Sequence, residues 1–203
     1  MLPADLSSNP TRFVLLALLL EGGLAAIATT IGWLIGFDPW YGMQRPGYDA
    51  IAFSRDLLWG IAATAPAVAV LLLESGRWSQ LLDDLKDQVS DLLQRLLRGA
   101  SLWQLLVIAF AAGVGEEVLF RGLIQAGLAQ LLPASWALVG SLLIASVLFG
   151  LCHYLSHTYF LLATLAGLYF GLLMLISESI LPAILAHALY DFIALAYLLH
   201  DDA

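Results

Sequence analysis

An apolar run from residue 102 to residue 132 contains three ionisable side chains, and this combination limits the chain to few kinds of fold. The three are Glu116, Glu117 and Arg121, in the stretch Gly-Glu-Glu-Val-Leu-Phe-Arg. A charged side chain at the centre of a bilayer costs about 2.5–3.5 kcal/mol on insertion scales, so such residues pair, face a wet cavity or carry chemistry. The run therefore predicts a buried helix whose charged residues share a site with other helices.

Helical geometry separates the two glutamates. Glu117 and Arg121 are four residues apart and lie on one face, where they can form an ion pair. Glu116 points about 100° away, above the small residues Ala112 and Gly113, which let another helix, water or a peptide approach closely. We interpret Glu117 and Arg121 as a brace and Glu116 as the working carboxylate. A single structural ion cluster between helices is the alternative that these residues alone leave open.

The composition is that of an integral membrane protein, so the lipid bilayer is an expected partner. Of 203 residues, 61% are hydrophobic, and only 12% are charged, about half the fraction of a typical soluble domain. Apolar segments follow one another closely, so we expect a single membrane domain over residues 1–203. The net charge of −8 and the lack of a basic patch argue against a nucleic-acid partner. Oligomeric state is not readable from the sequence.

Six apolar segments have the length and composition of spanning helices, so the expected fold class is an all-α membrane protein with about six transmembrane helices. The segments are 12–36, 57–73, 102–132, 136–154, 159–176 and 180–199. The first two form an N-terminal unit over 12–74, and the last four form a core over 102–199. The second segment is flanked by charged residues that we assign to the membrane interface, namely Arg55, Asp56 and Glu74.

Residues 77–98 follow a different pattern, that of an amphipathic helix. Apolar residues recur at helical spacing at Leu81, Leu82, Leu85, Val89, Leu92, Leu93, Leu96 and Leu97. The positions between them carry Asp83, Asp84, Lys86, Asp87, Asp91 and Arg95. This pattern predicts an interfacial helix that lies along the membrane surface, and a docking face for a partner helix is the alternative.

Basic residues in the loops predict the orientation of the chain. With six spans, five basic residues lie on one side of the membrane, and two lie on the other. The five are Arg12, Arg77, Lys86, Arg95 and Arg98, and the two are Arg45 and Arg55. The positive-inside rule then places both termini in the cytoplasm.

The first segment contains a further intramembrane charge, Glu21. We interpret it as paired in the bundle interior, with Arg55 as the partner, rather than as catalytic.

The later segments also deliver ionisable groups. His187 and Asp191 are four residues apart and share a helical face, and His153 ends the fourth segment. Burying such groups unpaired in lipid is expensive, so the simplest arrangement brings three helices to one wet site.

Several hydrolytic mechanisms lack their sequence patterns here. There is no Gly-x-Ser-x-Gly, no His-Glu-x-x-His and no second aspartate in a later span. A Glu and His site remains, which either activates water directly or holds a metal whose bound water is the nucleophile.

Three stretches resemble the motifs of the CAAX protease and bacteriocin-processing (CPBP, or Abi) family of intramembrane proteases, and the chain is similar to its type II CAAX prenyl endopeptidases. Residues 116–121 have the pattern Glu-Glu-x-x-x-Arg, residues 149–153 have Phe-x-x-x-His, and residues 187–191 have His-x-x-x-Asp. They occur in family order, and the resemblance covers about 102–199. It implies that this range is a CPBP-like catalytic core.

The resemblance also implies roles for single residues. Glu116 and His153 would activate water, and His187 and Asp191 would stabilise the oxyanion. Supporting residues would be Glu117, Arg121 and Phe149. Zinc held by the first four residues, or no metal at all, fits the family pattern, so a glutamate-dependent and a metal-dependent mechanism both stay open.

Asp191 stands where the prenyl-endopeptidase branch carries Asn. It could donate as a protonated acid, orient His187 or ligate a metal, and we favour the protonated donor because only a neutral Asp resembles Asn.

We therefore expect an intramembrane endopeptidase that hydrolyses a peptide bond of a membrane-associated or lipid-modified substrate through a Glu/His-activated water. The resemblance suggests a bacterial inner (plasma) membrane. The alternative from another class is a non-catalytic membrane scaffold or immunity protein of the same fold, which would bind a partner through residues 78–97. A small transporter is disfavoured because the sequence has no visible repeat symmetry.

Overall fold

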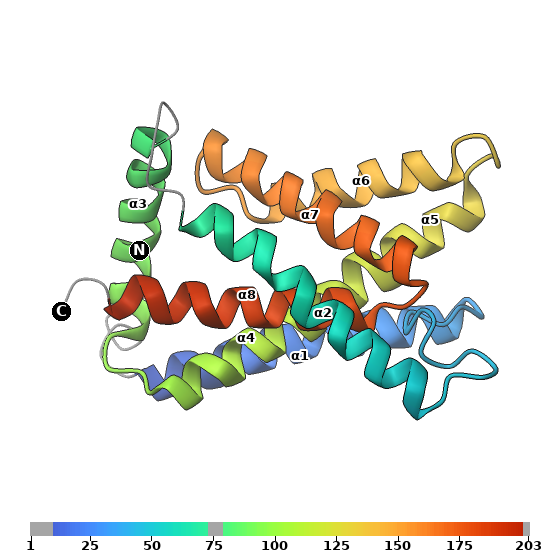
Figure 1. Cartoon of the computed structure of the whole chain (residues 1–203), viewed down its shortest axis with the longest axis horizontal. Helices are drawn as coiled ribbons and strands as arrows, with labels where there is room; N and C mark the ends of the chain where they lie inside the picture. The colour runs from blue at the N-terminus through green and yellow to red at the C-terminus, as the bar shows by residue number, and fades with distance from the viewer. Residues whose placement is uncertain (1–9, 73–78, 201–203) are drawn as a thin grey trace.

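The computed structural model describes residues 10–72 and 79–200, and every regular element in these residues is helical. In chain order the elements are α1 (Pro10–Leu34), α2 (Ala50–Leu71), α3 (Ser79–Leu97), α4 (Leu102–Glu117), the π-helix η1 (Val118–Gln125), α5 (Ala126–Leu131), α6 (Ala137–Cys152), α7 (His157–Ser177) and α8 (Leu181–His200). The long helices run beside one another as a bundle, and α3 lies across one end of it (Figure 1). The predicted all-α membrane fold is confirmed.

Four helical stretches are long and apolar enough to cross a membrane: Pro10–Leu34, Leu102–Leu131, His157–Ser177 and Leu181–Leu199. The α6 helix is apolar but has only 16 residues. The α2 helix has 22 residues, but it carries two charged residues near its start. The six predicted segments thus correspond to six helical stretches, of which four meet both criteria of length and composition.

The start of α2 differs from the prediction, because the helix begins at Ala50 rather than at residue 57. Asp49 caps it by accepting hydrogen bonds from the amides of Ile51 and Ala52, at 3.0 and 2.9 Å. This cap extends the helix through the polar stretch that precedes the apolar run.

Glycines let α1 and the loop after it lie directly on the α4–η1 segment. A side chain at Gly115 would overlap the backbone of Glu21, and one at Gly122 would overlap the backbone of Pro39. Small residues at helix contacts allow this close approach. The α1 helix is therefore seated along the middle of the stretch that carries the charged motif.

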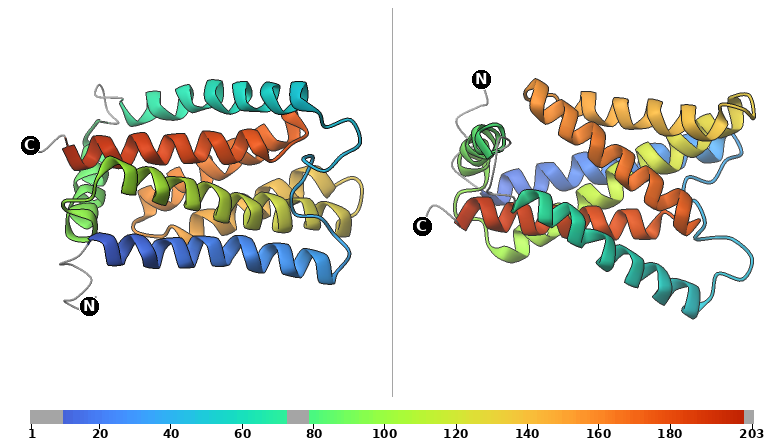
Figure 2. Two further views of the ribbon diagram at one scale, coloured as in Figure 1. Left: turned by 90° about the horizontal axis from the view of Figure 1, so that it is seen from below. Right: turned by 45° about the horizontal axis from the view of Figure 1, so that its top comes forward.

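The α3 helix lies at the end of the bundle where α1 and α4 begin and α8 ends (Figure 2). Two of its side chains, Ser90 and Gln94, donate to the carbonyls of Leu198 and Leu199 at the end of α8. Gly99 follows the end of α3 and has a positive φ of 79°, a backbone conformation that commonly ends a helix. Its position suits a helix on the membrane surface. Three residues that these predictions name lie outside the described residues. They are Glu74 and Arg77, predicted at the membrane interface, and Trp78, the first residue of the alternative docking segment.

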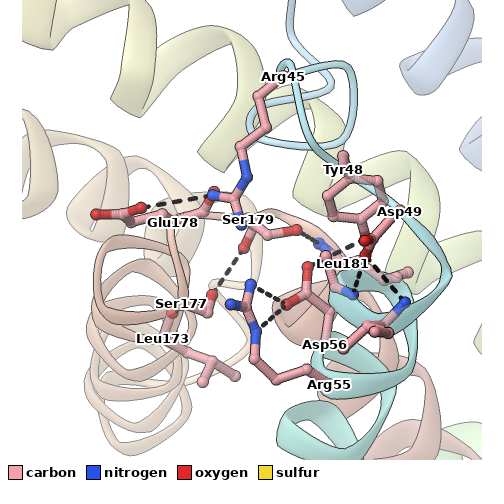
Figure 3. Close-up of polar contacts among 12 residues, drawn as sticks. Arg45, Tyr48, Asp49, Arg55, Asp56, Leu173, Ser177, Glu178, Ser179 and Leu181 are labelled. Atoms are coloured by element: carbon pink, nitrogen blue, oxygen red, sulfur yellow. Dashed lines mark hydrogen bonds and ion pairs between the residues drawn. The ribbon is translucent and has the colours of Figure 1, made fainter.

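A polar cluster at the opposite end of the bundle fixes the turn between α7 and α8 (Figure 3). Arg45 donates to the Glu178 carbonyl at 2.7 Å and pairs with its carboxylate at 3.5 Å. Tyr48 donates to Asp56 at 3.1 Å, and Arg55 pairs with Asp56 at 3.0 Å. Burial and the bond to Asp56 raise the pKa of the Tyr48 hydroxyl.

Two sequence-based interpretations are wrong at this cluster. Asp56 is not an interface residue but is fully buried, because Tyr48 and Arg55 supply the hydrogen bonds that an interior carboxylate needs. The predicted pair between Glu21 and Arg55 does not form, since Arg55 is engaged by its neighbour in α2.

Candidate active site

Glu117 connects three helical elements at the centre of the site. Its Oε1 atom accepts a hydrogen bond from His187 Nδ1 of α8 at 2.9 Å, and its Oε2 atom lies 3.1 Å from Arg121 Nε of η1. Both Glu117 and Arg121 are completely buried. The ion pair predicted from their spacing is present. The sequence does not predict the hydrogen bond between Glu117 and His187, because these residues are 70 positions apart.

Arg121 contacts an aromatic ring as well as its carboxylate partner. Its guanidinium carbon lies 4.6 Å from the centre of the Phe149 ring, in cation–π geometry. Its contact with Glu117 is short but poorly aligned for a hydrogen bond, and its Nη atoms have no hydrogen-bond partner among the described residues. Phe149 also stacks on His153, with ring centres 4.5 Å apart. The predicted supporting residue thus lies between the buried cation and a histidine.

Glu116 and His153 form a second pair, nearer to the outside. Their Oε2 and Nε2 atoms are 3.5 Å apart, and their side chains are 13% and 26% exposed. His153 Nδ1 lies 2.9 Å from the Phe149 carbonyl oxygen. Because a carbonyl only accepts hydrogen bonds, Nδ1 carries the hydrogen and Nε2 is directed to Glu116. The glutamate that faces away from Arg121 is therefore the one within reach of solvent and of a histidine.

His187 lies between two carboxylates. Since a carboxylate paired with Arg121 only accepts hydrogen bonds, His187 donates to Glu117 through Nδ1, and its Nε2 lies 3.4 Å from Asp191 Oδ2. Phe170 stacks on the imidazole with ring centres 4.9 Å apart and an interplanar angle of 7°. His187 is buried, whereas the side chain of Asp191 is 29% exposed. The pair thus has a fixed inner member and an accessible outer member.

A cavity of about 190 Å³ adjoins both pairs. His153, His187 and Asp191 form its polar part. The remaining walls are apolar or aromatic and come from α3, α6, α7 and α8: Leu85, Phe149, Tyr159, Leu162, Ala163, Ala166, Phe170 and Tyr190. Glu116 does not line this cavity and contacts its wall through His153. The cavity can accept an apolar group beside two histidines.

The predicted metal ligands stand as two separate pairs. Within residues 10–72 and 79–200, no three His, Cys, Asp or Glu side chains are grouped closely enough to hold a metal ion. A catalytic zinc site requires three protein ligands at about 2.0–2.2 Å from the ion. Glu116, His153, His187 and Asp191 do not fit that set in this arrangement.

Glu21 is the site residue that sequence reasoning missed. Its backbone lies against Gly115, and its carboxyl group interacts electrostatically most strongly with Glu116, and then with His187, Asp191 and His153. Its Oε2 atom is buried without a hydrogen-bond partner among the described residues. A glutamate in an apolar run was the available signal, but the pattern along α1 does not show which helix that glutamate faces.

Comparison with known protein families gives a match in the second half of the chain. Residues 98–193 match a family model described as type II CAAX prenyl endopeptidase Rce1-like, and this range contains all seven predicted site residues. Searches of curated proteins and of solved structures found no match.

Proposed function

Since residues 98–193 carry an Rce1-like domain of the CPBP family, we propose that the chain is an intramembrane endopeptidase that cleaves a membrane-associated or lipid-modified substrate. The observation that carries this proposal is the convergence of two carboxylate–histidine pairs beside one cavity. Glu116 and His153 form the first pair, and His187 and Asp191 form the second. A scaffold or immunity protein would bind a partner without needing two such pairs at a partly apolar cavity.

The first pair is suited to activate water. The Glu116 side chain is 13% exposed and its Oε2 atom lies 3.5 Å from His153 Nε2, so the carboxyl group and the imidazole can act on one water molecule bound at this pair. Glu116 takes one proton from that water, and the resulting hydroxide adds to the carbonyl carbon of the scissile bond. When the tetrahedral intermediate collapses, the C–N bond breaks, and the proton held by Glu116 passes to the leaving nitrogen.

The second pair is suited to stabilise the carbonyl oxygen of the scissile bond, which becomes negative as the hydroxide adds. Glu117 already fixes the orientation of His187 through Nδ1, so Asp191 is not needed for that purpose. Asp191 lies at the accessible end of the pair, where a protonated carboxyl group can donate a hydrogen bond to the oxyanion, as the amide of Asn would.

We propose that the end of the bundle with α3 faces the cytoplasm, following the five-to-two distribution of basic residues. Leu85 of α3 lines the cavity, so the cavity lies toward the same end. A substrate would then be cut near the cytoplasmic surface, and both termini would lie in the cytoplasm.

The direct test is cleavage of a peptide library by the full chain in lipid vesicles. The library should contain membrane peptides with and without a prenylated C-terminal cysteine, and mass spectrometry in ¹⁸O-water would identify the products. We expect cleavage at defined bonds, with one labelled oxygen in each new carboxyl group. Retention of one peptide without any cleavage would favour the scaffold alternative.

Asp191→Asn is expected to keep kcat within about tenfold of the wild type, because the amide supplies the N–H that the oxyanion requires. Asp191→Leu has no donor and should lose at least about 100-fold in kcat. Rates on a cleaved library peptide and the metal content of each purified protein are the measurements. An inactive, folded and metal-free Asp191→Asn protein beside a metal-loaded wild type would refute this role and favour a metal mechanism.

A further inference from the structure

We infer that Glu21 of α1 is a positioning residue of the active site that acts through Glu116. This inference rests on the proposed function and extends it beyond the matched range of residues 98–193. It concerns a helix to which the three motifs assign no part.

The packing of α1 brings Glu21 to Glu116. In both views of Figure 2, α1 runs beside the α4–η1 segment, and the backbone of Glu21 lies against Gly115, where any side chain would overlap it. Gly115 and Glu116 are neighbours in the chain, and consecutive Cα atoms are about 3.8 Å apart. The backbone of Glu21 therefore packs one residue away from Glu116, the residue whose carboxylate would activate water.

Glu21 differs from the other carboxylates of the site in having no basic partner. Glu116 is 3.5 Å from His153, Glu117 is 3.1 Å from Arg121, and Asp191 is 3.4 Å from His187. Glu21 forms no ion pair among the described residues, and its Oε2 atom is buried without a hydrogen-bond partner. Its strongest electrostatic interaction with a neighbouring carboxyl group is with Glu116.

A carboxyl group in this position is a cost to the fold. Buried polar atoms without partners destabilise a protein, and the cost is higher in a membrane-spanning helix, where lipid offers no hydrogen bonds. An apolar side chain would fill the same space without that cost. A residue that lowers stability beside a reactive group is typical of a functional site, where stability is lost for activity.

The role that the arrangement supports is orientation of the Glu116 carboxylate. Glu116 directly follows Gly115, on which the backbone of Glu21 packs, and its carboxylate lies 3.5 Å from the His153 imidazole of the α6 side. When Glu21 is ionised, it repels the Glu116 carboxylate toward the His153 side, and such a force acts strongly in a poorly solvated interior. Without Glu21, Glu116 is free to turn toward α1, away from the position where water would be activated.

The test compares Glu21→Gln and Glu21→Leu with the wild type in the full chain, on a library peptide that the wild type cleaves. We expect kcat to fall at least about tenfold in both variants, with KM changed by less than about twofold, since positioning of a base affects the chemical step rather than binding. We expect the Tm of Glu21→Leu to rise by at least about 2 °C, because a carboxyl group with one buried, unpartnered oxygen is removed. Thr30→Val, an exposed substitution on the same helix, is the control and should change neither quantity.

The outcomes separate this inference from the proposed function. A lower Tm in Glu21→Leu would show that Glu21 holds the fold, and an unchanged kcat would show that it does not act on Glu116; either result overturns the inference while the protease function stands. A wild type that cleaves no library peptide would refute the protease function itself, and the inference with it.

Discussion

Glu116→Gln is expected to reduce kcat by about 10³-fold or more, the upper part of the range for loss of a general base. Glutamine has nearly the same shape as glutamate, but its amide cannot take a proton from water. Stability should change little, because the ion pair described for Glu116 is the 3.5 Å contact with His153, and its side chain is partly exposed. Turnover of a library peptide and Tm in the same detergent or lipid are the measurements.

Glu178→Gln is the matched control for this experiment. Glu178 is an exposed glutamate in the turn between α7 and α8, at the end of the bundle opposite to α3. Its hydrogen bond to Arg45 uses the backbone carbonyl, which the substitution leaves intact. We expect full activity. Full activity in Glu116→Gln as well would exclude Glu116 as the base.

Glu117→Gln is expected to lower the free energy of unfolding by about 3–5 kcal/mol, the cost of breaking a buried ion pair by removing one partner. Arg121 is completely buried, and no other carboxylate is described in contact with it. The ring of Phe149 cannot neutralise the stranded charge. Denaturation of the purified protein, followed by helix content, measures the loss.

The double variant Glu117→Gln/Arg121→Met provides the control, because replacing both members of a buried pair by groups of similar volume is often neutral or stabilising. We expect it to recover most of the lost stability but little activity, since His187 still lacks the carboxylate that orients it. A Glu117→Gln protein as stable as the wild type but inactive would instead assign the catalytic role to Glu117.

The spacing of residues predicted contacts within a helix, whereas the contact between Glu117 and His187 on different helices was not predicted. The spacing of Glu117 and Arg121 predicts the ion pair that forms, and the spacing of His187 and Asp191 predicts their shared face. The bond between Glu117 and His187 depends on the depth and rotation of α4 against α8. Helical periodicity carries no information about either quantity.

The same limit explains the wrong partner for Arg55. The sequence shows a glutamate in one apolar helix and an arginine near the start of the next, and pairing them removes two charges from lipid at once. In the folded chain, Arg55 pairs with Asp56, its neighbour in α2, while the backbone of Glu21 packs on Gly115 of α4. The nearest opposite charge in the sequence therefore took the place of the partner expected from another helix.

The position of α3 has a consequence for how proteins of this architecture can diversify. Leu85 contributes a wall to the cavity, yet α3 precedes the matched range of residues 98–193, which contains every ionisable group of the three motifs. One part of the cavity wall is thereby supplied from outside the stretch that carries the ionisable groups. Variation at Leu85 can reshape that part of the cavity while each ion pair of the motifs stays intact, so that the shape of the cavity can change without a change in the motifs.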